Sequence, residues 1–188
     1  VGGVFKDYDI EGLACLQNVI YGTSGHDGHR SSELFTIRID ATANQTTLTK
    51  VGDIESSDHQ PYFEVAALAE KSDGTLWGYA DDGSQRGIIR INPTTAVAEM
   101  IQPARYKVEG IEWLGETLWL VGNTQFYTWT PGGEITKAFK VTSDQEIEAL
   151  DVIDGLLWVN LAQNNLTMLP LDPATGQIVP GGFKGNGY

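Results

Sequence analysis

The sequence predicts an all-β protein, a four-bladed β-propeller with about 46 residues and four antiparallel strands in each blade. Three observations predict this fold class. A motif of six residues occurs four times, an aromatic residue follows each copy at a nearly constant distance, and no segment has the apolar period of a capped helix. Three repeat steps cover the 137 residues from Glu11 to Glu148, and a step of about 46 residues is typical of a propeller blade.

The repeated motif marks the first strand of each blade. It occupies residues 9–14, 64–69, 107–112 and 146–151. Its fourth position is always small (Gly12, Ala67, Gly110, Ala149), and its fifth is always aliphatic (Leu13, Leu68, Ile111, Leu150). First strands are innermost in a propeller and approach one another closely. We therefore expect the small residue to face the crowded side and the aliphatic residue to pack between blades.

Three further strands complete each blade. The second carries an aromatic residue ten or eleven positions after the third residue of the motif (Tyr21, Trp77, Trp119, Trp158), and we expect at least three of these to be core. The third ends in a turn signal such as Asn92-Pro93. The fourth is a short β-like run, at 46–51, 97–101, 135–141 and 177–179. The blades of this single domain are thus predicted at approximately 9–53, 62–103, 107–141 and 146–182.

The composition excludes several classes of partner. The chain has 12 Lys and Arg against 25 Asp and Glu, a formal net charge of −13 and a pI of about 4.4. Nucleic acid and anionic lipid are therefore excluded, and no apolar run is long enough for membrane insertion. High acidity with few lysines and many Thr and Asn residues indicates an extracellular or cell-surface location. The absence of an initiator Met and of a signal peptide indicates a processed chain or a domain of a longer one.

The single cysteine, Cys15, lies in an apolar run, Leu13-Ala14-Cys15-Leu16. No intrachain disulfide can form, and no neighbour in the sequence would lower the pKa of the thiol. We therefore expect a buried structural thiol.

Strand order predicts which loops share a face of the propeller. Because strands within a blade are antiparallel, the blade-to-blade loops and the loops between second and third strands lie on one face. That face receives the long polar loops, and the opposite face receives short hairpin turns. A ligand is expected on the long-loop face. The candidate binding residues there are His26, Asp27, His29, Arg30, His59, Asp81, Asp82, Arg86, Asn123 and Asn164.

Two subsets of these residues have a metal alternative. His26 and His29, with His59 as a third ligand, could hold Zn²⁺ or Cu²⁺, although the spacing matches no specific motif and a solvated loop is the simpler interpretation. Asp81 and Asp82 precede a glycine in a turn that could bind Ca²⁺ but lacks the alternating ligands of an EF-hand loop.

Carboxylates also recur at the start of the inner strands. Glu11, Glu109 and Glu148 share one repeat position, and Asp9, Glu64, Lys107 and Glu146 lie two residues earlier. In a closed ring these side chains converge on the axis, where they repel one another unless Lys107, a shared proton or a cation compensates. Oxygen ligands suit Ca²⁺, so the predicted metal ligands are Glu11, Glu109, Glu148, Asp9, Glu64 and Glu146. The alternative is that they accept backbone N–H bonds or are solvated.

Residues 9–14, Asp-Ile-Glu-Gly-Leu-Ala, resemble the inner-strand motif of a group of calcium-containing propellers. That group includes the SdiA-regulated, esterase-like phytase and alkaline phosphatase PhoX families. Residues 107–111 and 146–150 are weaker matches. The resemblance covers about six residues per repeat and implies a propeller with Ca²⁺ near its axis. The extra catalytic loops of those larger propellers are not recognisable here, so it implies little about phosphatase activity.

No G-x-S-x-G, phosphate-binding glycine or H-E-x-x-H motif is present. The expected function is an extracellular binding or adhesion module for an unknown protein or glycan, with Ca²⁺ as a structural ion. Two alternatives stay open. One is a structural subunit of an oligomer or filament, joined through the glycine-rich ends 1–6 and 181–185 by strand addition. The other is a calcium-dependent phosphoesterase-like hydrolase.

Overall fold

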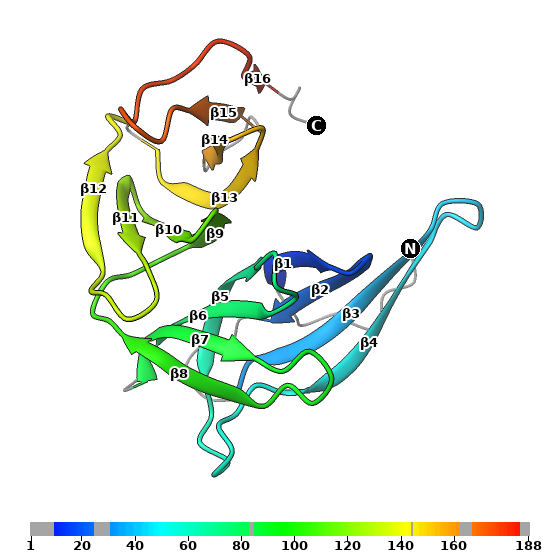
Figure 1. Cartoon of the computed structure of the whole chain (residues 1–188). Helices are drawn as coiled ribbons and strands as arrows, with labels where there is room; N and C mark the ends of the chain where they lie inside the picture. Colours follow the sequence, from blue (N-terminus) through cyan, green and yellow to red (C-terminus); the bar gives the residue numbers. More distant parts are fainter. Residues whose placement is uncertain (1–9, 25–30, 83–84, 144, 162–166, 185–188) are drawn as a thin grey trace. The chain divides into compact units, whose positions relative to one another are not determined.

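The computed structural model describes residues 10–24, 31–82, 85–143, 145–161 and 167–184. Within these residues, sixteen strands form four antiparallel sheets of four strands, and in every sheet the strands lie in chain order (Figure 1). Each sheet is one blade. The predicted fold class, an all-β protein with four four-stranded propeller blades, is confirmed.

The strands fall close to their predicted positions. Blade 1 contains β1 (Ile10–Leu16), β2 (Val19–Ser24), β3 (Glu33–Asp40) and β4 (Gln45–Asp53). Blade 2 contains β5 (Phe63–Glu70), β6 (Leu76–Asp82), β7 (Gly87–Ile91) and β8 (Ala98–Pro103). Blade 3 contains β9 (Gly110–Leu114), β10 (Thr117–Gly122), β11 (Gln125–Trp129) and β12 (Thr136–Lys140). Blade 4 contains β13 (Ile147–Ile153), β14 (Leu156–Leu161), β15 (Thr167–Leu171) and β16 (Phe183–Lys184). Two compact units result, Val1–Arg105 with blades 1 and 2, and Tyr106–Tyr188 with blades 3 and 4.

The outer strand of blade 4 differs from the prediction. The run 177–179 forms only an isolated bridge, between Ile178 and Leu171, with a hydrogen bond from the Val179 N–H to the Pro170 carbonyl at 2.8 Å. The regular pairing comes later, at Phe183–Lys184. Pro180 follows directly and has no N–H to donate, so it interrupts the pairing with β15.

Inner strands approach closely at the small position of the motif, as predicted. A Cβ added to Gly12 would lie 2.8 Å from the backbone nitrogen of Leu68, in the inner strand of the neighbouring blade. A Cβ on Gly110 would lie 2.8 Å from the backbone nitrogen of Leu150 in the same way. The same repeat position therefore joins two blades in each unit, and backbone atoms occupy the space that a larger side chain would need.

Each unit has its own hydrophobic core. Leu68 and Leu150, at the aliphatic position of the motif, belong to the cores of the first and second units. Trp77 and Trp119 are buried, and Tyr21 packs against the first core, so three of the four second-strand aromatics are core, as predicted. Trp158 is half-buried.

Leu13 and Cys15 correct two predictions. Leu13 has 57% of its surface exposed, although its counterparts Leu68 and Leu150 are 4% and 8% exposed. Cys15 is an exposed free thiol instead of a buried one. Both side chains lie on the face of blade 1 opposite Gly12, and Gly12 is the residue that meets blade 2. Within the first unit, blade 2 therefore covers the face of β1 that carries Gly12 and leaves the face that carries Leu13 and Cys15 uncovered.

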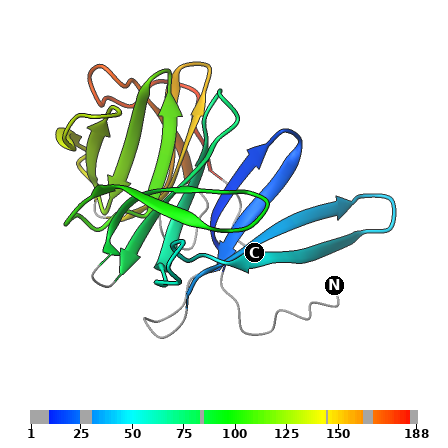
Figure 2. The same ribbon diagram turned by 60° about the horizontal axis from the view of Figure 1, so that its bottom comes forward.

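The β3–β4 hairpin continues beyond the rest of blade 1. Pairing between β2 and β3 ends at Ile20 and Ile37, whereas β3 and β4 stay paired as far as Asp40 and Gln45 (Figure 2). Ile39, on this extension, is 63% exposed. Among the described residues, no helix is long and apolar enough to span a membrane.

Candidate functional site

The predicted carboxylate position coincides with a β-bulge in three inner strands. The pairing register shifts between Ile10 and Gly12, between Val65 and Ala67, and between Ile147 and Ala149. Glu11, Ala66 and Glu148 are therefore the extra residues. In blade 3 the N–H of Glu109 donates to the Val121 carbonyl at 2.8 Å, and Val121 is also the partner of Gly110. A bulge bends the strand and turns its side chain away from the regular alternation. The repeat pattern located this position, but only the pairing register shows the bulge.

Glu109 and Glu146, two of the acidic residues at the start of the inner strands, have polar partners. The Lys107 Nζ lies 2.6 Å from a Glu109 carboxylate oxygen, so Lys107 supplies a counter-charge, one of the compensations that the sequence predicts. The Asn123 side-chain amide donates to the Glu146 carboxylate at 3.3 Å. Among the described residues, no group of three or more His, Cys, Asp or Glu side chains could hold a metal. Calcium near the axis therefore stays a prediction from the sequence.

Some predicted site residues cannot be placed. Asp9, His26, Asp27, His29, Arg30 and Asn164 lie outside the described residues. Asp82 ends β6. Asn123 is exposed at the turn after β10 and has a φ of +57°, which favours Asn or Gly.

Asp81 and Arg86 are brought together at the end of blade 2. The Asp81 side chain is 4% exposed, and the Arg86 Nε lies 3.6 Å from its Oδ1. The same Nε donates to the Asp81 backbone carbonyl. Glu64, at the start of β5, is held at a φ of +48°, a costly conformation for a non-glycine residue. Asp81 and Arg86, which are both predicted binding residues, thus form an ion pair, and the carboxylate of this pair is buried.

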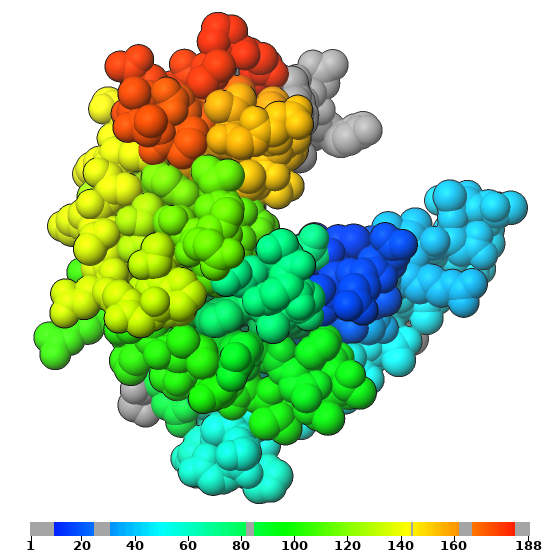
Figure 3. Space-filling view, viewed as in Figure 1, coloured from blue at the N-terminus to red at the C-terminus, as the bar shows by residue number. Residues whose placement is uncertain are grey.

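His59 lies elsewhere, at the tip of a small hairpin formed by residues 55–61. Glu55 pairs with Pro61, and the His59 N–H donates to the Ser56 carbonyl at 2.9 Å. The His59 side chain is 88% exposed, with Nδ1 3.3 Å from a Glu55 carboxylate oxygen. In the space-filling view this hairpin stands out as a cyan protrusion beside the green strands of blade 2 (Figure 3).

The length of β8 separates His59 from the Asp81–Arg86 pair. The Ala98 N–H, at the start of β8, donates to the Glu55 carbonyl of the hairpin. The Ala104 N–H, just past the other end of the strand, donates to the Arg86 carbonyl. A strand of six residues spans roughly 20 Å. The structure therefore does not gather His59 with Asp81 and Arg86.

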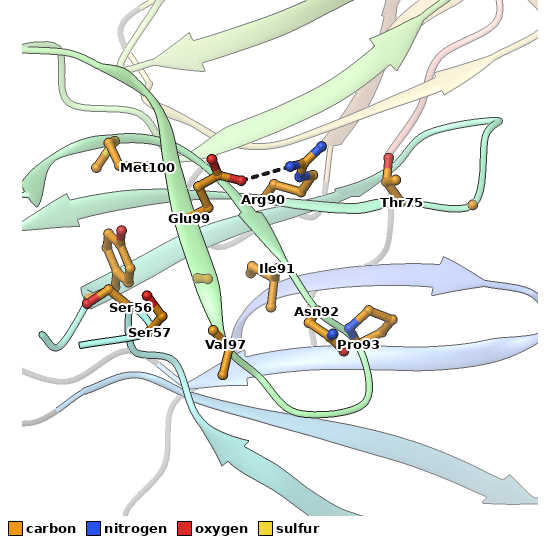
Figure 4. Close-up of a pocket in the computed structure, with 13 residues that line it drawn as sticks. Ser56, Ser57, Thr75, Arg90, Ile91, Asn92, Pro93, Val97, Glu99 and Met100 are labelled. Carbon is orange, nitrogen blue, oxygen red and sulfur yellow. Dashed lines mark hydrogen bonds and ion pairs between the residues drawn. The ribbon is translucent and has the colours of Figure 1, made fainter. Parts of the chain in front are cut away.

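A pocket of about 640 Å³ lies beside the hairpin, within the first unit (Figure 4). The hairpin, the β5–β6 turn, the β7–β8 turn and the strands β7 and β8 all contribute to it. Its polar lining residues are Ser56, Ser57, Thr75, Arg90, Asn92 and Glu99, and its apolar ones include Ile91, Pro93, Val97 and Met100. Sequence reasoning missed this pocket, because turns that it assigned to the short-turn face contribute to the lining. The one signal was the length of the connection from Asp53 to Tyr62, which is long enough to fold back along β8.

The polar side chains of the pocket are held in place by hydrogen bonds. The Asn92 Oδ1 accepts from the backbone N–H groups of Thr94 at 2.9 Å and Thr95 at 3.2 Å. The Thr75 hydroxyl accepts from the Trp77 indole N–H at 2.7 Å and donates to Asp73. This bond from Thr75 holds the pKa of Asp73 below its ordinary value. Such prior ordering reduces the entropy that a ligand must remove on binding.

Tyr62 also lines the pocket and is 2% exposed. Burial raises the pKa of its phenol, although a hydrogen bond with the Met100 backbone opposes the shift. Because the folded-state pKa is raised, the neutral phenol stabilises the fold below the unfolded value of about 10, and this contribution is lost as the pH rises through the folded pKa.

We expect Tyr62→Phe to reduce the loss of stability between about pH 9.5 and 11.5, because the variant has no phenol to ionise at this position. Urea unfolding across that range measures the effect. Tyr127→Phe should act in the same direction, since burial also raises the pKa of Tyr127. An unchanged pH dependence in Tyr62→Phe would show that Tyr62 ionises as freely in the folded chain as in the unfolded one.

Comparison with known proteins supports the fold. No protein-family model and no curated protein sequence matches the chain. Solved structures do match. The Myxococcus xanthus glutaminyl cyclase has a TM-score of 0.60 and 20% identity, over 90% of this chain and 68% of the cyclase. The chain is similar in fold to this enzyme.

Two further enzymes match in the same way. The Staphylococcus aureus virginiamycin B lyase has a TM-score of 0.56 and 17% identity, over 96% of this chain and 57% of the lyase. A puromycin hydrolase has a TM-score of 0.53 and 17% identity, over 91% of this chain and 28% of the hydrolase. The chain thus spans little more than half of the lyase and under a third of the hydrolase. At these identities the likeness shows the propeller fold alone.

Proposed function

We propose that the protein is an extracellular binding module and that its ligand, a glycan or a protein, occupies the pocket of blade 2. The observation that carries the proposal is the composition of this pocket. The hairpin, two turns and two strands supply polar and aliphatic side chains to one cavity. The aliphatic ones, here called the apolar floor, are Ile91, Pro93, Val97 and Met100, and Val97 is 43% exposed. A concave apolar surface with a few ordered polar groups is the usual form of a ligand site.

The charged groups in the pocket support binding over catalysis. Among the described lining residues, the charged ones are Arg90 and Glu99, and they pair with each other at 2.7 Å. The hydroxyls of two lining residues, Ser56 and Thr75, donate to carboxylates in their own turns, Asp58 and Asp73, and each of these bonds stabilises its turn. The cyclase, lyase and hydrolase named above share the fold with this chain, and a fold hosts many unrelated activities. The acidic composition supports the extracellular location.

Arrays of glycans and of extracellular proteins, probed with the intact chain, test this function. We expect spots that the wild type binds to be lost with Val97→Glu, because the new carboxylate places an unpaired charge on the apolar floor. Ile178→Glu is the matched control, since Ile178 is 58% exposed in blade 4 and should leave binding unchanged. Melting curves check that both variants fold. Spots that survive Val97→Glu would show that the ligand binds outside the pocket.

A further inference from the structure

The two charged side chains described in the pocket lining, Arg90 and Glu99, have opposite signs, so their charges cancel. Arg90 and Glu99 lie side by side on β7 and β8 and are paired with each other, with side chains 49% and 65% exposed (Figure 4). The whole chain has a formal net charge of −13. A phosphate, sulfate or carboxylate ligand would therefore meet Glu99 at close range and an unfavourable field at longer range. An uncharged ligand avoids both costs.

The pocket offers a ligand both hydrogen-bond donors and hydrogen-bond acceptors. The Asn92 Oδ1 is engaged by two backbone N–H groups, which leaves its side-chain amide group as the donor. Glu99 has a second carboxylate oxygen beyond the one that Arg90 binds. The Ser57 hydroxyl also lines the pocket. A ligand hydroxyl both donates and accepts, so it can use adjacent groups of either kind.

An extended peptide is disfavoured at this place. Peptides that bind to sheets commonly add a strand to an exposed edge. The outer edge of β8 is already engaged, because the Ala98 N–H donates to the Glu55 carbonyl at 2.7 Å and the Met100 backbone hydrogen-bonds Tyr62. The hairpin 55–61 thus occupies the position that a peptide strand would take.

The floor and the size of the pocket suit a sugar ring. Ile91, Pro93, Val97 and Met100 are aliphatic, and Val97 is 43% exposed. One face of a pyranose consists of C–H groups, which gain from burial on such a surface. A volume of about 640 Å³ lies within the range of small-ligand sites and is sufficient for one or two sugar units.

We infer that the ligand of this pocket is a neutral saccharide, with a C–H face on Val97 and hydroxyls on Arg90, Glu99 and Asn92. The inference rests on the proposed function, that the pocket binds a ligand, and adds the chemical class.

The test is an NMR titration of the intact ¹⁵N-labelled chain. The neutral probes are maltose, lactose, cellobiose and N,N′-diacetylchitobiose. The comparison probes are glucuronate and an uncharged extended pentapeptide. We expect at least one neutral disaccharide to give saturable shifts, confined to amides of the pocket residues. Glu99→Ala and Asn92→Ala should each weaken this binding about tenfold or more, because each removes a hydrogen-bonding group.

The matched control is Lys50→Gln, which breaks a comparable ion pair on blade 1, where Lys50 lies 2.7 Å from Glu33. This variant should bind like the wild type. Pocket shifts caused only by glucuronate or by the peptide would overturn the saccharide inference and leave the proposed function standing. Shifts confined to other regions would overturn both. No shifts with any probe would overturn the saccharide inference alone, and the arrays would then decide the proposed function.

Discussion

Thr23→Val is expected to lower the free energy of unfolding of the first unit by about 2–4 kcal/mol. Thr23 is fully buried. Its hydroxyl accepts from the Gly12 N–H at 3.0 Å and donates to the Val65 carbonyl at 2.8 Å, so it connects the inner strands of blades 1 and 2. Valine has the same shape and makes neither bond, and it would leave a buried donor and a buried acceptor without partners. Urea unfolding monitored by circular dichroism measures the change.

Thr47→Val is the matched control for Thr23→Val. Thr47 lies on β4 and is exposed, so the same chemical change should alter stability by less than about 0.5 kcal/mol. Equal small effects from both substitutions would show that the contact between β1 and β5 does not depend on the Thr23 hydroxyl.

Gly122→Ala is expected to destabilise the second unit by about 3 kcal/mol or more. A Cβ at Gly122 would lie 1.8 Å from the Lys107 carbonyl oxygen and 2.8 Å from its carbonyl carbon. Both are backbone atoms, so no side chain can rotate away, and the segment that leads into β9 must move. Thermal and urea unfolding of the purified variant measure the loss.

Gly133→Ala provides the comparison for Gly122→Ala. Its added Cβ would come no closer than 3.2 Å to a neighbouring atom, the Thr130 hydroxyl oxygen, which requires only a small adjustment. If the two variants were equally stable, the close approach between Gly122 and Lys107 would have no energetic consequence.

The repeat motif predicted the architecture because each copy performs the same physical role. A small residue at Gly12 and Gly110 is needed wherever an inner strand meets the backbone of the next blade, so the requirement is visible in the sequence. The aromatic positions Trp77 and Trp119 follow from the same periodicity, since they fill the wider space farther out. Contacts that recur at the same position of several blades can therefore be predicted from the sequence.

The direction of the acidic side chains and the exposure of Leu13 cannot be predicted from the repeat motif. Regular alternation places Glu11 and Glu148 on a predictable side of the strand, but a bulge at each position changes that direction. The exposure of Leu13 depends on which face of blade 1 its neighbour covers. These outcomes are set by pairing register and by tertiary contact.

None of the residues that line the pocket was among the binding residues predicted from the sequence, and those residues stay a prediction. Asp81 and Arg86 were expected on one face and do form an ion pair. His59 was expected there too, but its hairpin runs along the far end of β8. The pocket arises because this hairpin meets the turn that contains Asn92, and loop length alone does not reveal where a loop folds back.

A crystal structure of the chain with its bound ligand would decide whether blade 2 holds the binding site. We expect difference density for the ligand between Ser57 and Asn92, in contact with Val97 and within hydrogen-bond distance of Glu99. Density at the Asp81–Arg86 end of β8 instead, with the pocket unchanged, would contradict the assignment and move the site to the long-loop end of the blade.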